Sequence, residues 1–315
     1  MPTKRSRVHP KYKTQYRVSN WSDYDQVLAQ RGNITLWLAQ DAIDHCNAKP
    51  TKRRGGQPKY SDLAIETTLT LRLLLHLPLR QAEGFLVSII ELMAVPLDVP
   101  DHTTLSRRSA RLDLPLHIPR DPGSINLVVD SSGLAIFGEG EWAAAKHGGK
   151  GIQGWRKLHL GVDDTGVIVA QILTDANTDD ATTGAALVDA VDADIDAIIG
   201  DAAYDTRPFY AASRSKGARV VVPPVKNAKA KRPRCAARDR TIRRVHEVGR
   251  RQWKKEVGYH RQARAENAFF RLKTIIGDRL RARTSPAQMA EARIACNMLN
   301  RMTELGRPES YPIEK

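Results

Sequence analysis

The chain is 315 residues long, 41% of its residues are hydrophobic, and its formal net charge is +15 at pH 7. This length and apolar content suffice for one large folded domain and a smaller one, whereas no apolar run approaches the roughly 20 residues that a membrane-spanning helix needs. Three widely spaced cysteines without a C-x-x-C pair argue against a disulfide framework or a structural zinc site. The basic N-terminus lacks the apolar segment of a secretory signal, so we expect a cytoplasmic protein.

Residues 1–60 are predicted to form a basic arm and linker. They contain twelve Lys or Arg against four Asp or Glu. The segment KTQYRVSNW at 13–21 is strand-like, whereas the Gly-Gly pair and the proline of RRGGQPK at 53–59 disfavour regular structure. Arg53 and Arg54 in this run suit contacts with phosphate groups, and a solvated hinge is the alternative.

Residues 61–118 are predicted to form a helical domain. Ser61 and Asp101 are good N-caps for a first and a third helix, and a second helix lies between them. The predicted helices run from Asp62 to about Leu77, from Leu79 to about Met93, and over HTTLSRRSARL from residue 102. Three helices with short connections are typical of a helix-turn-helix DNA-binding module, although many small helical bundles have the same pattern. The candidate DNA contacts on the third helix are Arg107, Arg108 and Arg111.

A proline-rich boundary at 112–124 precedes a change in apolar period, and residues 121–305 are predicted to form an α/β domain. Three strands are predicted first, at 125–137, 157–163 and 167–173, with hairpin-turn residues before the last. A helix at 179–191, a strand at 195–201, a helix at 208–217 and a strand at 218–224 follow. The order β-β-β-α-β-α-β predicts a ribonuclease-H-like mixed sheet with flanking helices.

A basic insert at about 224–256 precedes a predicted helix at 259–276. One side of this helix carries apolar residues at helical spacing, which predicts packing into the core. These residues are Ala265, Phe269, Leu272 and Ile276. Three other residues stand seven positions apart, about two helical turns, and are predicted to share a second face. These are Tyr259, Glu266 and Lys273.

Two basic regions flank an acidic centre. Residues 226–286 contain twenty Lys or Arg against five Asp or Glu, whereas residues 121–205 contain four against fifteen. Solubility alone does not require this pattern, but a long polyanion held next to a carboxylate-rich centre does. No basic amphipathic helix with an aromatic apolar face favours a membrane surface, so nucleic acid is the expected partner.

Asp130 and Asp201 are the candidate carboxylates of that centre. Asp130 lies within the first predicted strand, where burial of an unpaired charge is prohibitive, so it must emerge on a solvated face or hold a cation. Asp201 ends the fourth strand, which neighbours the first in mixed sheets of this type. Two carboxylates so close repel each other, and Mg²⁺ relieves the repulsion, with Glu266 as a third ligand. Two such ions about 3.5–4 Å apart can activate a water or hydroxyl and stabilise the leaving oxygen of a phosphodiester.

Seven segments, together with the helix around Glu266, carry a resemblance to a known family. They are YRVSNW at 16–21, LRQAEGF at 79–85, VPDHTTLSRR at 99–108, VDSSGL at 129–134, GEGEWAAAKHG at 138–148, WRKLHLGVD at 155–163 and GDAAYD at 200–205. Over nearly its whole length the chain resembles the DDE transposases of bacterial insertion sequences, specifically the insertion-sequence-five family. The resemblance implies a ribonuclease-H-like fold, a catalytic and metal-binding triad of Asp130, Asp201 and Glu266, and Mg²⁺ as cofactor, with Mn²⁺ expected to substitute.

The family's signature around the last acid is Tyr, Arg, Glu and Lys, separated by two, three and six residues. Tyr259, Glu266 and Lys273 match it, whereas Gln262 stands at the Arg position. The match favours DNA contacts for Tyr259 and Lys273, with half-buried packing and an exposed helix lysine as the alternatives. Within GDAAYD, Asp201 keeps the strand-end position and Asp205 is the alternative acid.

Other residues are candidates for supporting groups. Trp253 stands between two basic residues, which favours stacking on an unpaired base, with a core tryptophan as the alternative. Lys157 and His159 alternate along the second strand and therefore face the same way; Lys157 is a candidate DNA contact, and His159 is predicted to be structural. Ser131 and Ser132 lack the G-x-S-x-G elbow and the oriented histidine of a hydrolase nucleophile.

The favoured function is metal-dependent cleavage of DNA at insertion-sequence ends, followed by attack of the freed 3′ hydroxyl on target DNA. A same-fold nuclease that cuts without joining is one alternative, and a non-catalytic DNA-binding protein, either a repressor or a decayed transposase, is another. A haloacid-dehalogenase-type phosphatase is disfavoured, because Ser132 stands where its second acid is required. Pairing of two DNA ends leads us to expect a homodimer, and the resemblance implies a bacterial, nucleoid-associated protein.

Overall fold

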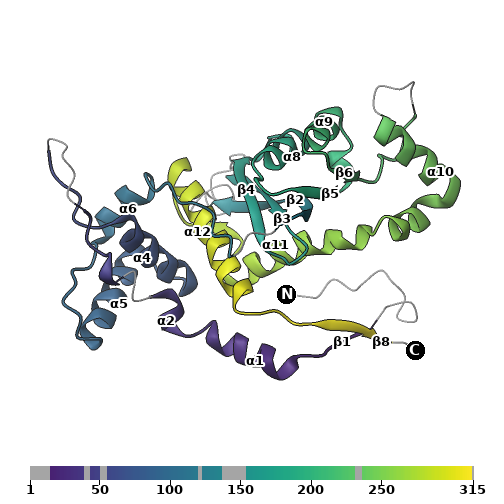
Figure 1. The fold of residues 1–315 in the computed structure, drawn as a ribbon. Coiled ribbons are helices and arrows are strands. Elements are labelled where there is room, and N and C mark those ends of the chain that lie inside the picture. Colours follow the sequence, from purple (N-terminus) through teal and green to yellow (C-terminus); the bar gives the residue numbers. More distant parts are fainter. Residues whose placement is uncertain are drawn as a thin grey trace, which may run out of the picture.

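The structure is a computed structural model that describes residues 15–38, 43–49, 55–119, 123–136, 154–230 and 236–313. Arg53, Arg54 and the segment 138–148, which the sequence analysis singled out, lie outside the described residues. Figure 1 shows a group of helices at one end of the molecule, a sheet with its own helices at the other, and a long helix between them. The arrangement of the sheet and its covering helices decides which polar side chains meet.

Three short helices occupy the segment that was predicted to be helical: α4 (Asp62–Leu74), α5 (Leu79–Leu92) and α6 (His102–Ser109). The Ser61 hydroxyl accepts a backbone N–H at 3.1 Å, and the Asp101 carboxylate accepts two at 2.8 and 2.9 Å. Both predicted N-caps are therefore confirmed. The first helix ends earlier than predicted, because His76 adopts a left-handed φ of 56° that an α-helix cannot contain. The DNA-binding role of α6 stays a prediction.

The sheet has the predicted composition and neighbours. Its strands are β2 (Ile125–Ile136), β3 (Trp155–Val162), β4 (Ile168–Asp175), β5 (Ile195–Ile199) and β6 (Arg219–Val221), with β7 (Arg279–Leu280) added beside β2. The order is β4-β3-β2-β5-β6; β2 runs antiparallel to β3 and parallel to β5. The expectation that the first and fourth predicted strands are neighbours is confirmed. This mixed sheet with helices is consistent with a ribonuclease-H-like domain.

Helices cover both faces of the sheet, and β2 contributes to the core on each side because alternate residues of a strand point in opposite directions. Leu127 and Val129 join the apolar cluster beneath α8 (Asp180–Asp189) and α9 (Arg207–Ser215). Val128 joins the cluster that includes residues of α11 (Ala263–Ile275) and α12 (Ser285–Glu304). Figure 1 shows the sheet between α8 and α9 on one side and α11 on the other.

The long helix α12 was not predicted, and it joins the two ends of the molecule (Figure 1). Most of its residues are buried, and it packs against α4, α6 and β4. Asn300 is fully buried, and its side-chain amide bonds the backbone N–H and carbonyl of Ile168 at 2.8 Å each and the carbonyl of His117 at 2.7 Å. One apolar cluster therefore continues from α4–α6 into the sheet, while the domain boundary at 112–124 stays a prediction.

The basic insert forms a long helix, α10 (Ala236–Glu256), which is kinked at Gly249, where φ is 79°. The predicted single helix at 259–276 is wrong in its first turn, because Gly258 takes a left-handed conformation and Tyr259–Gln262 then form a 3₁₀ turn. The apolar stripe is confirmed, since Ala265, Phe269 and Leu272 are buried on α11 and Ile276 follows it at 8% exposure. Only Glu266 and Lys273, of the three residues on the second face, share an α-helix.

The two ends of the described chain lie side by side. The strand β1 (Gln15–Val18), predicted within 13–21, pairs antiparallel with β8 (Ser310–Ile313) (Figure 1). Two helices that were not predicted follow β1: α1 (Trp21–Gln30), which buries no residue, and α2 (Ile34–Trp37).

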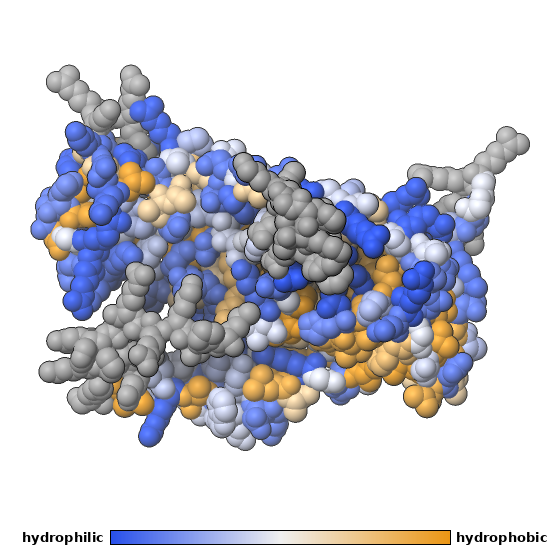
Figure 2. All heavy atoms as spheres, turned by 180° about the vertical axis from the view of Figure 1, so that it is seen from behind, coloured by the Kyte–Doolittle hydropathy of each residue, from blue (hydrophilic) through white to orange (hydrophobic). Residues whose placement is uncertain are grey.

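Figure 2 shows that the face opposite to that of Figure 1 is mostly hydrophilic, with hydrophobic side chains gathered toward the α4–α6 end. Large apolar side chains exposed at that end include Leu75, Val87, Leu92 and Met93. Within the described ranges, no single helix is long and apolar enough to cross a membrane; α4 and α5 satisfy the length and composition requirement only as a pair bent by 109°.

Candidate active site

Asp130 lies on β2, directly after the buried residues Leu127, Val128 and Val129. Its carboxylate accepts the N–H of Ser131 at 2.9 Å. Burial, together with the nearby carboxylates of Asp201, Glu266 and Asp180, raises the pKa of Asp130 from 3.8 to about 6, and the hydrogen bond from the Ser131 N–H opposes this rise. Asp130 is therefore a half-buried acid that other acids surround.

Asp201 and Glu266 reach this neighbourhood from two further segments. Asp201 follows β5 and caps a 3₁₀ turn (Ala202–Tyr204), where its side chain accepts the N–H of Ala203 at 2.8 Å. Glu266 lies in the first turn of α11, a helix that packs against β2. Both acids also act on Tyr259, whose pKa burial raises to about 12 with contributions from Asp201, Asp130 and Glu266. Three acids from separate segments thus share one electrostatic environment.

The donor set suits a hard divalent cation. Carboxylate oxygens are the ligands that Mg²⁺ and Mn²⁺ prefer, and a cation would relieve the repulsion that raises the pKa of Asp130. Among the described residues, however, no three His, Cys, Asp or Glu side chains stand close enough to hold one ion. The residues therefore fit the cation in chemistry, and binding would require the three carboxylates to approach one another.

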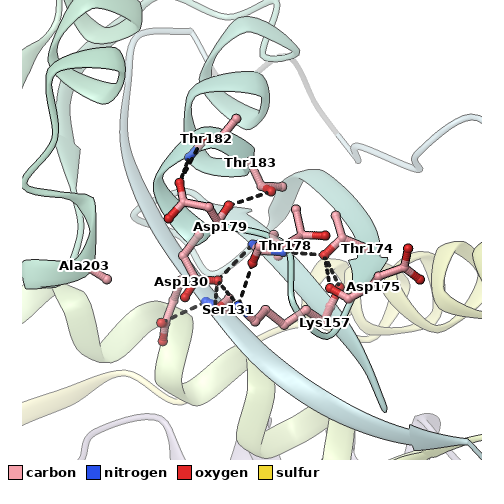
Figure 3. Close-up of polar contacts among 12 residues, drawn as sticks. Asp130, Ser131, Lys157, Thr174, Asp175, Thr178, Asp179, Thr182, Thr183 and Ala203 are labelled. Atoms are coloured by element: carbon pink, nitrogen blue, oxygen red, sulfur yellow. Dashed lines mark hydrogen bonds and ion pairs between the residues drawn. The ribbon is translucent and has the colours of Figure 1, made fainter. Parts of the chain in front are cut away.

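Asp180 is a fourth carboxylate, which the sequence analysis did not single out. It is the first residue of α8, and it accepts hydrogen bonds from the Ser131 hydroxyl at 3.0 Å and from the Lys157 ammonium at 3.1 Å. Lys157 also donates to the Thr178 carbonyl at 2.8 Å (Figure 3). Because the Ser131 N–H holds Asp130 while its hydroxyl holds Asp180, Ser131 connects the two acids. The Asp179-Asp180 pair is typical of a helix start, but only the fold shows which of the two aspartates faces the sheet.

His159 is a structural residue, as predicted. It is fully buried, its Nε2 lies 2.9 Å from the Thr174 hydroxyl, and its Nδ1 lies 3.8 Å from the Asp180 carboxylate. Burial lowers the pKa of His159 to about 4, which Asp180 partly opposes. The imidazole is therefore neutral at pH 7 and supports the strand pair β3–β4.

Some of the candidate DNA contacts are buried or paired with other side chains, whereas others are exposed. Trp253 is only 3% exposed and lies 6.4 Å from the Tyr259 ring, so it is a core residue and does not offer a face to a base. Lys157 forms an ion pair with Asp180, whereas Lys273 is exposed two turns beyond Glu266. Phe270, which the sequence analysis left aside, is 66% exposed one turn beyond Glu266.

Asp205, the alternative acid, and Arg108, a candidate DNA contact, both take structural roles. The Asp205 carboxylate is fully buried and accepts two hydrogen bonds from the Arg238 guanidinium at 2.6 and 2.8 Å, so Asp205 is not available to the acidic centre. Arg108 donates to Asp62 at 2.6 Å and to the Tyr60 carbonyl at 2.9 Å, and so ties α6 to the start of α4.

Gln262 replaces the arginine of the family signature, and it lies directly behind the acidic centre. It is 6% exposed, and its side-chain N–H group lies 3.4 Å from the Val129 carbonyl, next to Asp130. Of the other predicted contacts, Arg107 and Arg111 are exposed at the end of α6. These two positions remain candidates for DNA contacts.

Comparison with known protein families identifies the family of the chain. Acids that converge from a strand, a strand end and a helix over a ribonuclease-H-like sheet define a class of enzymes that cleave nucleic acid. Two family models described as transposase DDE domain match residues 29–139 and 121–301. The second match covers more than half of the chain and contains Asp130, Asp201 and Glu266. The chain belongs to the DDE transposase family, whose members bind DNA and typically use divalent metals.

Proposed function

We propose that this chain is a transposase of the insertion-sequence-five type from a bacterium. It would cleave DNA at the ends of its insertion sequence and transfer the freed 3′ hydroxyl to target DNA. The observation that carries the proposal is that Asp130, Asp201 and Glu266 come from three separate segments into one electrostatic environment, inside the region that matches the transposase DDE domain. Perturbed acids of this kind gather at catalytic sites.

In this proposal Asp130, Asp201 and Glu266 hold the divalent cations. When bound, Mg²⁺ or Mn²⁺ supplies an activated water or hydroxyl and stabilises the leaving oxygen of the phosphodiester. The Ser131 N–H orients Asp130, and the Lys157 ammonium pairs with Asp180 and offsets part of the charge that this acid adds to the site. Most of the catalytic effect would then come from positioning and electrostatics.

The DNA duplex is expected to lie along the exposed basic surface of the protein. An open groove of about 710 Å³ runs between residues 226–230 and α10, and its lining includes Lys226, Lys229 and Arg243. Its positive charge suits a phosphate backbone. Lys273 and Phe270 extend the line from Glu266 along α11, where they would contact a phosphate and a base. Pairing of two DNA ends requires two copies of the chain, so we expect a homodimer on DNA.

A non-catalytic DNA-binding protein is the second candidate. Gln262 favours it, because a neutral amide stands where the family signature has a positive charge beside the catalytic acids. A nuclease that cuts without joining has the same site, and only its products distinguish it from a transposase.

The test is a plasmid that carries the DNA flanking the gene of this chain, incubated with the full chain and Mg²⁺ or Mn²⁺. We expect nicking at the ends and joined products, both lost in Asp130→Asn. Asp189→Asn removes an exposed carboxylate of α8 and serves as the matched control. Unchanged nicking by Asp130→Asn would exclude the assigned site; nicking without joining would indicate the nuclease, and DNA binding without nicking the non-catalytic protein.

A further inference from the structure

Three buried polar atoms without a hydrogen-bond partner surround the acidic centre. Within the part of the chain that the structure describes, these are His159 Nδ1, the Tyr204 hydroxyl and Gln262 Oε1. A buried polar atom without a partner is costly and rare, and it calls for an explanation such as an ion, a water or a catalytic role. They are three of the seven such side-chain atoms in the described residues, and their gathering around the acids makes this site the one to explain.

Tyr204 is the most informative of the three. It is 1% exposed, and its pKa is raised first by burial and then by the carboxylates of Asp130, Asp180 and Asp201. Its hydroxyl group therefore lies among the acids although its ring is deep in the core. Ser131 acts on this pKa in the opposite direction through its side chain, so the two hydroxyl groups already lie beside each other, although not in the geometry of a hydrogen bond.

The Tyr204 ring fits at this position because two neighbouring residues are glycines. A Cβ atom on Gly184 would lie 2.6 Å from the ring, and one on Gly200 would lie 2.9 Å from it. Phe209 packs against the same ring at 5.1 Å between centroids. A glycine inside a helix weakens the helix, so Gly184 within α8 is a cost that the placement of Tyr204 explains.

We propose that Tyr204 is a positioning residue whose hydroxyl donates a hydrogen bond to Ser131 when a divalent cation assembles the acidic centre. Ser131 already donates its hydroxyl hydrogen to Asp180 and its backbone N–H to Asp130, and its oxygen retains lone pairs that accept a further bond. The new bond would complete a chain from Tyr204 through Ser131 to both acids and fix the orientation of Asp130. This inference rests on the proposed function, since it requires that the acids hold a cation.

A purely structural role predicts a different outcome for the same substitution. Phenylalanine fills the space of the ring equally well and removes the hydroxyl that has no partner, so Tyr204→Phe should leave the metal-free protein as stable as the wild type or more stable. A positioning role predicts in addition that cation binding weakens. Residues that support metal ligands typically contribute about tenfold or more to metal affinity.

The experiment measures Mn²⁺ binding to the full chain by electron paramagnetic resonance of the free ion, together with thermal unfolding in EDTA. We expect Tyr204→Phe to bind Mn²⁺ about tenfold more weakly at an unchanged or higher unfolding temperature. Tyr210→Phe removes the hydroxyl of another buried tyrosine, on α9, and should bind Mn²⁺ like the wild type. Ser131→Ala should weaken binding at least as much as Tyr204→Phe, and the double variant no more than Ser131→Ala, because Tyr204 acts on the acids only through Ser131.

The outcomes separate this inference from the proposed function. If Asp130→Asn binds Mn²⁺ like the wild type, the proposed site fails. If Asp130→Asn loses binding and Tyr204→Phe does not, the function stands and the role of Tyr204 is refuted. A lower unfolding temperature of Tyr204→Phe in EDTA, or losses that add in the double variant, would also refute it, because either result indicates packing alone.

Discussion

Two regions of this protein bury aspartates, and they treat them in opposite ways. Asp205 lies four residues after Asp201, fully buried, with a bidentate Arg238 and the N–H of Val225 as partners. Asp130 is half-buried, yet one N–H is its hydrogen-bond partner, and burial together with three other carboxylates raises its pKa. A buried charge with a complete set of partners supports the fold, whereas one among like charges is held for a ligand.

The largest effect is expected where the buried charge is satisfied. Asp205→Asn removes the charge that pairs with Arg238 and leaves the guanidinium without its counter-ion. Because breaking a buried pair leaves an uncompensated charge, we expect the free energy of unfolding to fall by about 2–4 kcal/mol in urea denaturation. Asp189→Asn, on an exposed turn, should change it by less than about 0.5 kcal/mol. Equal effects of the two variants would show that the Asp205 pair does not support the fold.

The packing around Tyr204 gives the next effect in size. Alanine normally stabilises a helix interior relative to glycine by about 0.5–1 kcal/mol, but at Gly184 its Cβ would meet the tyrosine ring at 2.6 Å. We therefore expect Gly184→Ala to destabilise the protein by about 1–3 kcal/mol, as overpacking of a core does. In a Tyr204→Leu background the ring is absent, and the same substitution should cost less. A stabilising Gly184→Ala would mean that the ring is not confined there.

Removal of the Asp130 charge is expected to stabilise the protein, in contrast to removal of the Asp205 charge. The folded-state pKa of Asp130 is about 6 against an ordinary value of 3.8, so the folded protein binds the proton more tightly than the unfolded chain. Stability is therefore lost as the pH rises from about 4 to about 6. In EDTA at pH 7, Asp130→Asn should raise the free energy of unfolding by about 1–2 kcal/mol, after allowance for the partial exposure of the site.

This gain should disappear at pH 4, where the wild-type acid is protonated as well, and thermal unfolding at the two pH values measures it. Mn²⁺ should reverse the difference, because the cation stabilises only the protein that binds it. A destabilising Asp130→Asn at pH 7 without metal would place Asp130 with Asp205 among the structural acids.

The sequence predicted the elements whose pattern is local. Alternating and buried apolar runs located the strands, and the order of strands and helices correctly made β2 and β5 neighbours. The predicted acids Asp130, Asp201 and Glu266 consequently fall into one electrostatic environment. Helix α12 escaped prediction, since polar residues such as Asn300 and Glu291 are buried in it and interrupt its apolar pattern.

Side-chain partners were harder to predict than strands. Trp253 has the same basic neighbours in sequence whether it faces DNA or the core, and only the packing against Tyr259 decides the matter. Lys157 was predicted to contact DNA, but its ammonium pairs with Asp180, which comes from a different segment. Such pairings depend on tertiary structure, so a single sequence does not reveal them.

The smallest effect is expected on the exposed surface beside the acids. Lys273 forms no ion pair with any described residue, and it lies two turns from Glu266 on α11. If it contacts a phosphate, Lys273→Ala should weaken DNA binding about threefold to tenfold, equally for different sequences, and reduce the slope of log affinity against log salt by about 1. Lys157→Ala is the matched comparison, because that ammonium is already held by Asp180 and should change the salt slope little. Fluorescence anisotropy at several salt concentrations measures both slopes, and a larger change for Lys157 than for Lys273 would move the DNA path from α11 to the α8 side of the sheet.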